Sequence, residues 1–334
     1  MSMANKPVDP SEWKGSELSD PAAWTYVLSE DEAAELTKAT DRCLREGRGV
    51  SEISPHDFVL PTLGATIRRW AGEIDHGRGF LLARGLPREF SDAQIRTAFW
   101  GIGLYLGDPI SQNSYGDMLG EVYDQGVKMG DGRVRGYRTS QRLMFHTDRA
   151  DIVGLLCLRP ARNGGLSSIT SSTRVYRELE AHYPQLLEPL HRGYIHASME
   201  EGGAVTQRRV PVYSIYQGVL SCRIQRNTIE STRKLGYASY EALETEALQR
   251  FDDLVNRAEF RIDMMLERGD MQFINNYTTL HARTEFEDFD DPALRRHMVR
   301  LWLNSHGVRR PVDPMVFEGY GGIESTLASG VTNP

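Results

Sequence analysis

The chain has 334 residues, of which 40% are hydrophobic and 25% charged, and its formal net charge is -7. This is the composition of an ordinary globular protein, and its acidic balance argues against a nucleic-acid partner, which needs a basic surface. No apolar run approaches the roughly 20 residues of a membrane span, and the polar start of the chain lacks a signal-peptide core. We therefore expect a cytoplasmic protein that does not bind membranes.

The cysteines are few and widely separated: Cys43, Cys157 and Cys222. An odd number with no CxxC pair argues against a disulfide framework and a cysteine-rich zinc site. Buried free thiols in a reducing compartment are the expected state.

The first part of the chain reads as helical. Residues 1–22 are rich in Pro, Ser, Asp and Lys and predict a flexible N-terminal arm, and 23–334 predict a single domain. Ser29 as N-cap, acids in the first turn and Gly47 at the end predict the first helix. A second helix is predicted over 61–76 and a third over 91–107. Between them, 77–86 predicts a short strand with glycine on both sides.

The middle and the end of the chain have a different texture. Short runs rich in β-branched residues alternate with Gly, Asn and Pro, a pattern that is typical of strands separated by turns. A hairpin is predicted over 211–224, with Gln217 and Gly218 near its turn. Helices interrupt this pattern at 173–191 and 240–260. Without repeats or a break in composition, we predict a β core decorated with helices.

The sharpest motif is Phe145-His146-Thr147-Asp148. In a strand, residues i and i+2 point to one face, so His146 and Asp148 would present an imidazole and a carboxylate side by side. Two histidines and one carboxylate make the facial triad of a non-haem iron, which leaves open positions on the metal. His281, in the run NNYTTLH, is the best candidate for the second histidine.

The stretch RRHMVRLWL, residues 295–303, reads as a strand with two different faces. One face carries Arg296, Met298, Arg300 and Trp302, and the other is mostly aliphatic and suited to a core. If the first face points inward, its arginines need anionic partners such as a ligand carboxylate, which a guanidinium binds through two parallel hydrogen bonds. Alternatively, this face is a solvated edge, or its arginines pair with nearby acids.

Five motifs occur in one order: HTD at 146–148, GG-x-S at 164–167, GD at 269–270, NNYTTLH ending at His281, and RRHMVR at 295–300. Over about 79–303, this resembles the TauD/TfdA family of iron(II)- and 2-oxoglutarate-dependent dioxygenases. The resemblance implies a double-stranded β-helix (jelly-roll) core with flanking helices. It also implies an enzyme that uses Fe(II), 2-oxoglutarate and O2 to oxidise a small molecule. Members of the family are often dimers or tetramers, which leaves a homo-oligomer open.

The resemblance also implies roles for individual residues. His146, Asp148 and His281 would bind the iron. Arg296 matches the arginine that holds the distal carboxylate of 2-oxoglutarate, and Ser167 takes the place of a threonine that helps it. Arg300 lies where some members have a second arginine that meets an anionic substrate. Because the carboxylate of Asp148 is retained, we predict oxygenation rather than halogenation.

Only isolated polar residues indicate where the substrate pocket lies. Its candidates are Asn113 and Gln112 in one loop, Arg223 after a strand, and Asn276 beside His281, although loop capping or strand hydrogen bonding would explain each of them. The glycine-rich segment 126–137 reads either as a lid or as a plain surface loop. The arginines favour an anionic or zwitterionic substrate.

Three other functions remain open at this point. The same cofactors could drive desaturation, epoxidation or cyclisation instead of hydroxylation. The chain could be a non-catalytic jelly-roll protein that only binds a metal or a ligand, but retention of the three metal-binding residues and of Arg296 argues against this. A zinc hydrolase would need a further carboxylate base beside the metal, such as HExxH supplies, and none is apparent.

Overall fold

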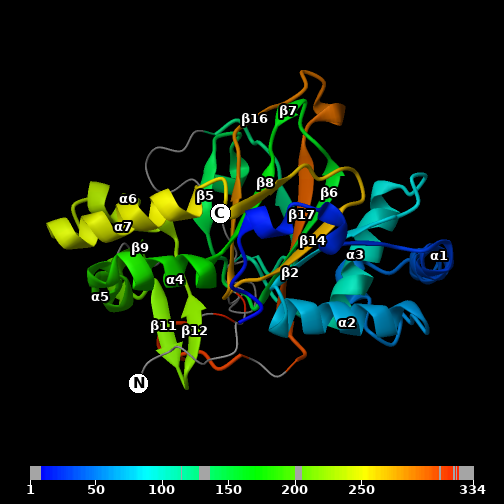
Figure 1. Cartoon of the computed structure of the whole chain (residues 1–334). Helices are drawn as coiled ribbons and strands as arrows, with labels where there is room; N and C mark the ends of the chain where they lie inside the picture. The colour runs from blue at the N-terminus through cyan, green and yellow to red at the C-terminus, as the bar shows by residue number, and fades with distance from the viewer. Residues whose placement is uncertain are drawn as a thin grey trace.

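The protein is described by a computed structural model in which residues 9–113, 115–127, 136–199, 205–307, 310–318, 320 and 322 are placed (Figure 1). Two sheets form its centre. The larger has the order β1 (Thr25–Val27), β2 (Phe80–Arg84), β14 (Met271–Asn275), β6 (Ile152–Arg159), β17 (His297–Ser305) and β3 (Gly107–Pro109), with β4 (Leu119–Val122) also on β17. The smaller has the order β13 (Arg261–Met264), β8 (Ser167–Ser171), β15 (Thr279–Arg283) and β5 (Leu143–His146).

Apolar side chains from both sheets meet in one cluster, which includes Val153 and Trp302 from the larger sheet and Ile169 and Ile262 from the smaller. Two facing sheets with a shared apolar interior are the arrangement of a double-stranded β-helix. The predicted β core with flanking helices is therefore confirmed.

Strand β17 has the two faces that its sequence predicts. Val299, Leu301 and Leu303 join the cluster under the N-terminal helices. Met298 and Trp302 join the cluster between the sheets. Because alternate residues of a strand point to opposite faces, Arg300 is carried to the interior side as well.

Three helices cover the outer face of the larger sheet, on the right in Figure 1: α1 (Glu30–Arg45), α2 (Leu63–His76) and α3 (Asp92–Leu106). Ser29 caps α1 as predicted, because its side chain accepts from the backbone N–H of Glu32 while the Glu32 carboxylate accepts from that of Ser29. Ser91 and Gln94 form the same arrangement at the start of α3.

The other helices lie beside the smaller sheet, on the left in Figure 1. They are α4 (Ser172–His182), α5 (Leu187–Arg192), α6 (Arg226–Lys234) and α7 (Ala242–Val255). Two hairpins accompany them, β9 (Tyr194–Met199) with β10 (Val205–Val210) and β11 (Tyr213–Tyr216) with β12 (Val219–Cys222). The second is the predicted hairpin, whose turn places Gln217 and Gly218 at φ of 50° and 79°, as a two-residue loop requires. Helix α6 was not predicted, because its sequence RNTIESTRK is polar with one large apolar residue.

The remaining elements are short. Strands β7 (Asn163–Gly164) and β16 (Phe286–Glu287) pair with each other, and the 3-10 helices are η1 (Gly15–Leu18), η2 (Pro21–Ala23), η3 (Val50–Glu52), η4 (Gly136–Arg138), η5 (Pro184–Leu186) and η6 (Pro292–Leu294). Within the described residues, no helix combines the length and the apolar character needed to cross a membrane. Cys43, Cys157 and Cys222 are buried and free.

Residues 9–22, which the sequence predicted as part of a flexible arm, pack against the rest of the protein. Trp13 is 4% exposed, its indole Nε1 donates to the carbonyl oxygen of Arg78 at 2.9 Å, and its ring lies 5.0 Å from that of Phe80. Ser11 is buried and donates to the hydroxyl of Thr173. The physical reason is the burial of Trp13 on the sheet, which the polar composition of the segment conceals. Residues 1–8 lie outside the described part of the chain.

Candidate metal centre

His146 and His281 stand directly opposite each other in the antiparallel pair β5 and β15. Their ring centroids are 4.1 Å apart. Asp148 follows two residues after the end of β5, and the ligand atoms of the three side chains all lie within 4.8 Å of one another. Cross-strand neighbours in a sheet have side chains on the same face, so the pairing of two distant segments creates the cluster that the sequence predicted.

Each ring offers a nitrogen to the centre. His146 Nδ1 lies 2.9 Å from the carbonyl oxygen of Met144, which accepts its hydrogen and leaves Nε2 free for a metal. His281 Nε2 lies 3.7 Å from the Asp148 carboxylate. His281 Nδ1 is buried and has no hydrogen-bond partner among the described residues.

The protonation states suit metal binding. Burial and the nearby charge of His281 lower the pKa of His146 to about 3, so this imidazole is neutral near pH 7. Burial alone would raise the pKa of Asp148, but the charge of Arg300 and the hydrogen bond and charge of His281 outweigh it and hold that pKa well below its usual range. A neutral imidazole and an ionised carboxylate are the forms that bind divalent metals.

Two further side chains hold the Asp148 carboxylate. Arg300 Nη1 donates to both of its oxygens, at 3.2 and 3.1 Å, and Trp302 Nε1 donates to Oδ2 at 3.0 Å. Gln112 in turn accepts from Arg300 Nε at 2.9 Å and donates to the carbonyl oxygens of Met118 and Arg300. The role of Trp302 was missed, and its place on the face of Arg300 in the 295–303 strand was the signal that could have revealed it.

Asn276, a candidate for the substrate pocket, holds the loop that contains Asp148. It is fully buried, and its amide nitrogen donates to the carbonyl oxygens of Asp148 and Ala150 at 2.9 and 2.8 Å. Its amide oxygen accepts from the backbone N–H of Asp148 at 2.9 Å. Both of its donor hydrogens are therefore used inside the protein.

Arg296 is a buried cation whose guanidinium forms no ion pair among the described residues, although the Asp288 carboxylate accepts from its backbone N–H. It is 4% exposed, its Nη1 has no hydrogen-bond partner there, and its guanidinium lies 5.1 Å from the Phe286 ring centroid. Burial lowers its pKa to about 10, so it stays charged at neutral pH. An unpaired buried charge is costly, and a ligand carboxylate would offset that cost.

The Gly-Gly-x-Ser motif packs beside this arginine. A Cβ on Gly165 would lie 3.2 Å from Arg296 Nε, and Gly165 has a φ of +72°. Glycine is therefore needed for both the conformation and the close approach. Ser167 is buried on β8, where its hydroxyl donates to Gln272 Oε1 at 3.1 Å.

The other sequence candidates lie in different surroundings. Asn113 caps its own turn, because its side-chain oxygen accepts from the backbone N–H groups of Tyr115 and Asp117 and its amide donates to the Asp117 carboxylate. These contacts are the loop capping that the sequence left open as the alternative role of Asn113. Arg223 is buried and directly precedes Ile224, whose carbonyl oxygen accepts from the backbone N–H of Thr147. Of the segment 126–137, which the sequence left open as a lid or a plain surface loop, residues 128–135 lie outside the described part of the chain.

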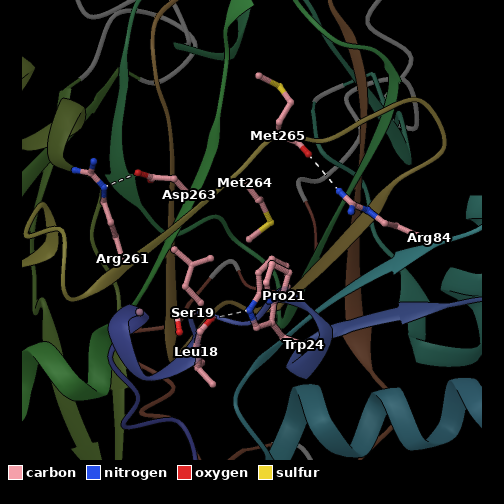
Figure 2. Close-up of a pocket in the computed structure, with 11 residues that line it drawn as sticks. Leu18, Ser19, Pro21, Trp24, Arg84, Arg261, Asp263, Met264 and Met265 are labelled. Atoms are coloured by element: carbon pink, nitrogen blue, oxygen red, sulfur yellow. Dashed lines mark hydrogen bonds and ion pairs between the residues drawn. The ribbon is translucent and has the colours of Figure 1, made fainter.

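A surface groove of about 380 Å³ lies away from the three metal-binding candidates (Figure 2). Figure 2 shows Trp24 and Pro21 facing Met264, with the Arg261–Asp263 ion pair on one side and Arg84 on the other. The groove thus runs between β13, at the edge of the smaller sheet, and the N-terminal segment that leads into β1. It contains none of His146, Asp148 and His281.

Comparisons with known proteins decide the family. The family model described as "Taurine catabolism dioxygenase TauD, TfdA family" matches residues 44–302. The FR-33289 synthase of Streptomyces rubellomurinus is 32% identical over 308 residues, which cover 90% of this chain and 91% of that protein. The chain belongs to the TauD/TfdA family.

Two further similarities agree with this membership. The taurine hydroxylase-like protein SAT17 of Stachybotrys chartarum is 27% identical over 94% of this chain and 86% of its own length. Asparagine oxygenase, solved in complex with Fe(II), 2S,3S-3-hydroxyasparagine and succinate, has the same fold, with a TM-score of 0.65 and 18% identity over 84% of this chain and 93% of that one. The predicted jelly-roll core and dioxygenase class are confirmed, and this TauD/TfdA member is an iron(II)- and 2-oxoglutarate-dependent dioxygenase.

Proposed function

We propose that His146, Asp148 and His281 bind the catalytic iron. The observation that carries the proposal is the convergence of their ligand atoms to within 4.8 Å, in a cluster where His146 is neutral and Asp148 is ionised. The buried guanidinium of Arg300 beside Asp148 adds a further polar group to this centre. Because ligand type alone does not select the metal, the choice of iron rests on the family.

The second part of the proposal concerns 2-oxoglutarate. Arg296 would pair with its distal carboxylate, and the hydroxyl of Ser167, which donates to Gln272 in this structure, would turn to donate to the same group. The buried, unpaired Nη1 of Arg296 supports this fit, since a carboxylate supplies the charge and the acceptor that this cation lacks. The bound metal, with 2-oxoglutarate and O2, would supply the oxidising power for the C–H bond, with succinate and CO2 as the other products.

The substrate of the proposed reaction is a small anionic or zwitterionic molecule that undergoes hydroxylation. Retention of the Asp148 carboxylate supports oxygen transfer over halide transfer. Asp148 is fixed by Arg300, Trp302 and the backbone clamp of Asn276, so its oxygens are positioned before any ligand arrives. We further propose that residues 23–334 form a single domain, against which residues 9–22 pack through Trp13. From the buried free thiols, we propose a cytoplasmic location.

The test is anaerobic reconstitution of the full-length protein with iron(II) and 2-oxoglutarate. Wild type is expected to show the weak visible charge-transfer band of the iron–2-oxoglutarate chelate. His146→Ala is expected to abolish the band. Arg296→Ala should retain it only at roughly 10- to 100-fold higher 2-oxoglutarate, because a lost hydrogen bond to a charged group costs about 1.5–3 kcal/mol.

Arg162→Ala is the matched control for Arg296→Ala, because it removes an arginine from an exposed ion pair with Glu287. It should leave the band and its 2-oxoglutarate dependence unchanged. Absence of the band in folded wild type supplied with iron would overturn the proposal, and zinc-dependent hydrolysis would then be measured.

A further inference from the structure

A second group of cationic side chains lies beside the metal centre. His196 on β9 and Arg208 on β10 are paired across their hairpin. Arg223 follows the end of β12, and Arg149 follows Asp148 directly. Contacts with one C-terminal segment connect the hairpin to Arg223, because Arg208 pairs with Glu318 and Arg223 Nη1 donates to the carbonyl oxygen of Val316. Burial, and then the charges of Arg223, Arg149 and Arg208, lower the pKa of His196.

Backbone hydrogen bonds tie this group to the metal-binding segment. Thr147, between two proposed iron ligands, donates its N–H to the carbonyl oxygen of Ile224 at 2.9 Å and accepts from the Ile224 N–H at 3.1 Å. Arg223 is the neighbour of Ile224 in the chain. Its guanidinium lies 5.3 Å from the ring centroid of Tyr320. Burial raises the pKa of Tyr320, the charge of Arg223 lowers it, and the charge of Asp148 raises it. The cationic group therefore lies next to the place where the substrate must be oxidised.

Arg223 is built into the protein without a counter-ion. It is 6% exposed, its Nη1 donates to the carbonyl oxygen of Val316, and its Nε is buried without a partner among the described residues. No described carboxylate lies within ion-pair distance of it. Leaving a buried guanidinium unpaired costs stability, so such a group indicates a site for a ligand anion.

The charges of the group do not cancel. Arg208 forms an ion pair with Glu318. Arg149, half-buried, forms no hydrogen bond or ion pair with any described residue, and Arg223 has no ion pair there either. Burial and the three arginines lower the pKa of His196 to about 3, which leaves it neutral and able to donate one hydrogen bond. Two positive charges thus remain uncompensated.

We propose that Arg149, Arg223 and His196 form a subsite for the doubly charged phosphate or phosphonate group of the substrate. The inference rests on the proposed function, because it places this group beside the iron that oxidises the rest of the molecule. A phosphorus oxyanion matches the two uncompensated arginines in charge, whereas a carboxylate or a sulfonate carries a single charge. Its three oxygens can accept from two guanidinium forks and one imidazole N–H. Arg300 is already engaged with Asp148 and Gln112.

The test is calorimetric titration of the full-length protein with four small probes: methylphosphonate, ethyl phosphate, methanesulfonate and acetate. Methylphosphonate or ethyl phosphate is expected to bind at least about tenfold more tightly than the singly charged probes. Whichever of these two binds more tightly identifies the source of the group. Arg223→Gln and Arg149→Gln should each weaken that binding roughly 10- to 100-fold, the loss expected for a hydrogen bond to a charged group.

Arg233→Gln on α6 is the matched control, because its side chain is 54% exposed and pairs only with Glu230 among the described residues. It should bind the probes as wild type does. Arg223→Lys, which keeps the charge, should retain part of the affinity and shows whether loss in Arg223→Gln reflects misfolding.

Equal affinity for all four probes, or undiminished binding in both glutamine variants, would overturn the inference. The iron–2-oxoglutarate band is measured in the same wild-type samples without a probe. A normal band without selective probe binding rejects the subsite alone. Selective binding without the band supports the subsite and rejects the iron assignment.

Discussion

Arg300 and Asp148 form an ion pair of 3.1 Å in which the two side chains are only 12% and 10% exposed. The arginine expected to meet an anionic substrate thus contacts a proposed iron ligand in this structure. The pair gives the metal-free protein a cation beside a buried carboxylate, which would otherwise be unpaired.

Replacement of this arginine should destabilise the metal-free protein more than the metal-loaded protein. Arg300→Met leaves Asp148 ionised and buried without its cation, at a cost of about 3–5 kcal/mol. A bound divalent metal supplies a new cationic partner and reduces the loss. The measurement is thermal unfolding with and without manganese(II).

Arg226→Met serves as its control, because Arg226 is 10% exposed and pairs with Asp252 and Glu230, neither of which is a proposed metal ligand. Its loss of stability should not depend on the metal. An Arg300→Met penalty that is the same with and without metal would contradict the role given to this pair.

Gly165→Ala should raise the 2-oxoglutarate concentration needed for half of the chelate band. The new Cβ would lie 3.2 Å from Arg296 Nε, and the φ of +72° adds roughly 1–2 kcal/mol of strain. Gly236→Ala is the control, since Gly236 has a φ of +79° but nothing within 4 Å of the new Cβ. Both variants should lose stability, and only Gly165→Ala should weaken 2-oxoglutarate binding. An equal dependence on 2-oxoglutarate in the two would show that Gly165 does not position Arg296.

Asn276→Ala should unfold more readily and bind metal poorly. It leaves the backbone N–H and carbonyl of Asp148 and the carbonyl of Ala150 without their buried partner, and each unpaired group costs about 1–3 kcal/mol. Denaturant unfolding measures the loss. Asn113→Ala, which removes the cap of a surface turn, should cost about 1 kcal/mol or less. Similar losses in the two variants would argue against the clamp.

The stability of the protein should depend on His196 below neutral pH. The pKa of His196 is about 3 in the folded state against 6.5 for the free group, because burial and Arg223, Arg149 and Arg208 disfavour its charged form. The unfolded chain therefore takes up the proton first, and stability is lost as pH falls from about 6.5 toward 3, by up to about 1.4 kcal/mol per pH unit.

His196→Gln removes this contribution. The difference in unfolding free energy between variant and wild type, measured in denaturant at several pH values between 4 and 7, should shift in favour of the variant as pH falls. Parallel curves for the two proteins would show that His196 is not held neutral by its surroundings.

The sequence by itself determined the components of the centre. The spacing of His146 and Asp148 sets both side chains on one side of a short segment. The alternation of side chains along 295–303 correctly separated the aliphatic core residues from Met298 and Trp302, which point inward. The caps of α1 and α3 were equally readable, because Ser29 and Ser91 act on residues three positions away. Such local rules need only the geometry of one strand or one helix end.

Only the tertiary structure decided which groups meet. The cross-strand pairing of His146 with His281 joins segments about 130 residues apart, and the burial of Trp13 appears only when the N-terminal segment packs on β2. Asn276 and Arg300 were read as substrate residues because sequence shows a polar side chain but not its partner. Their contacts with Asp148 depend on how the strands are registered, and so does the position of Arg223 beside Thr147. Hydrogen bonds and ion pairs between distant segments are fixed by the packed fold, which local sequence does not specify.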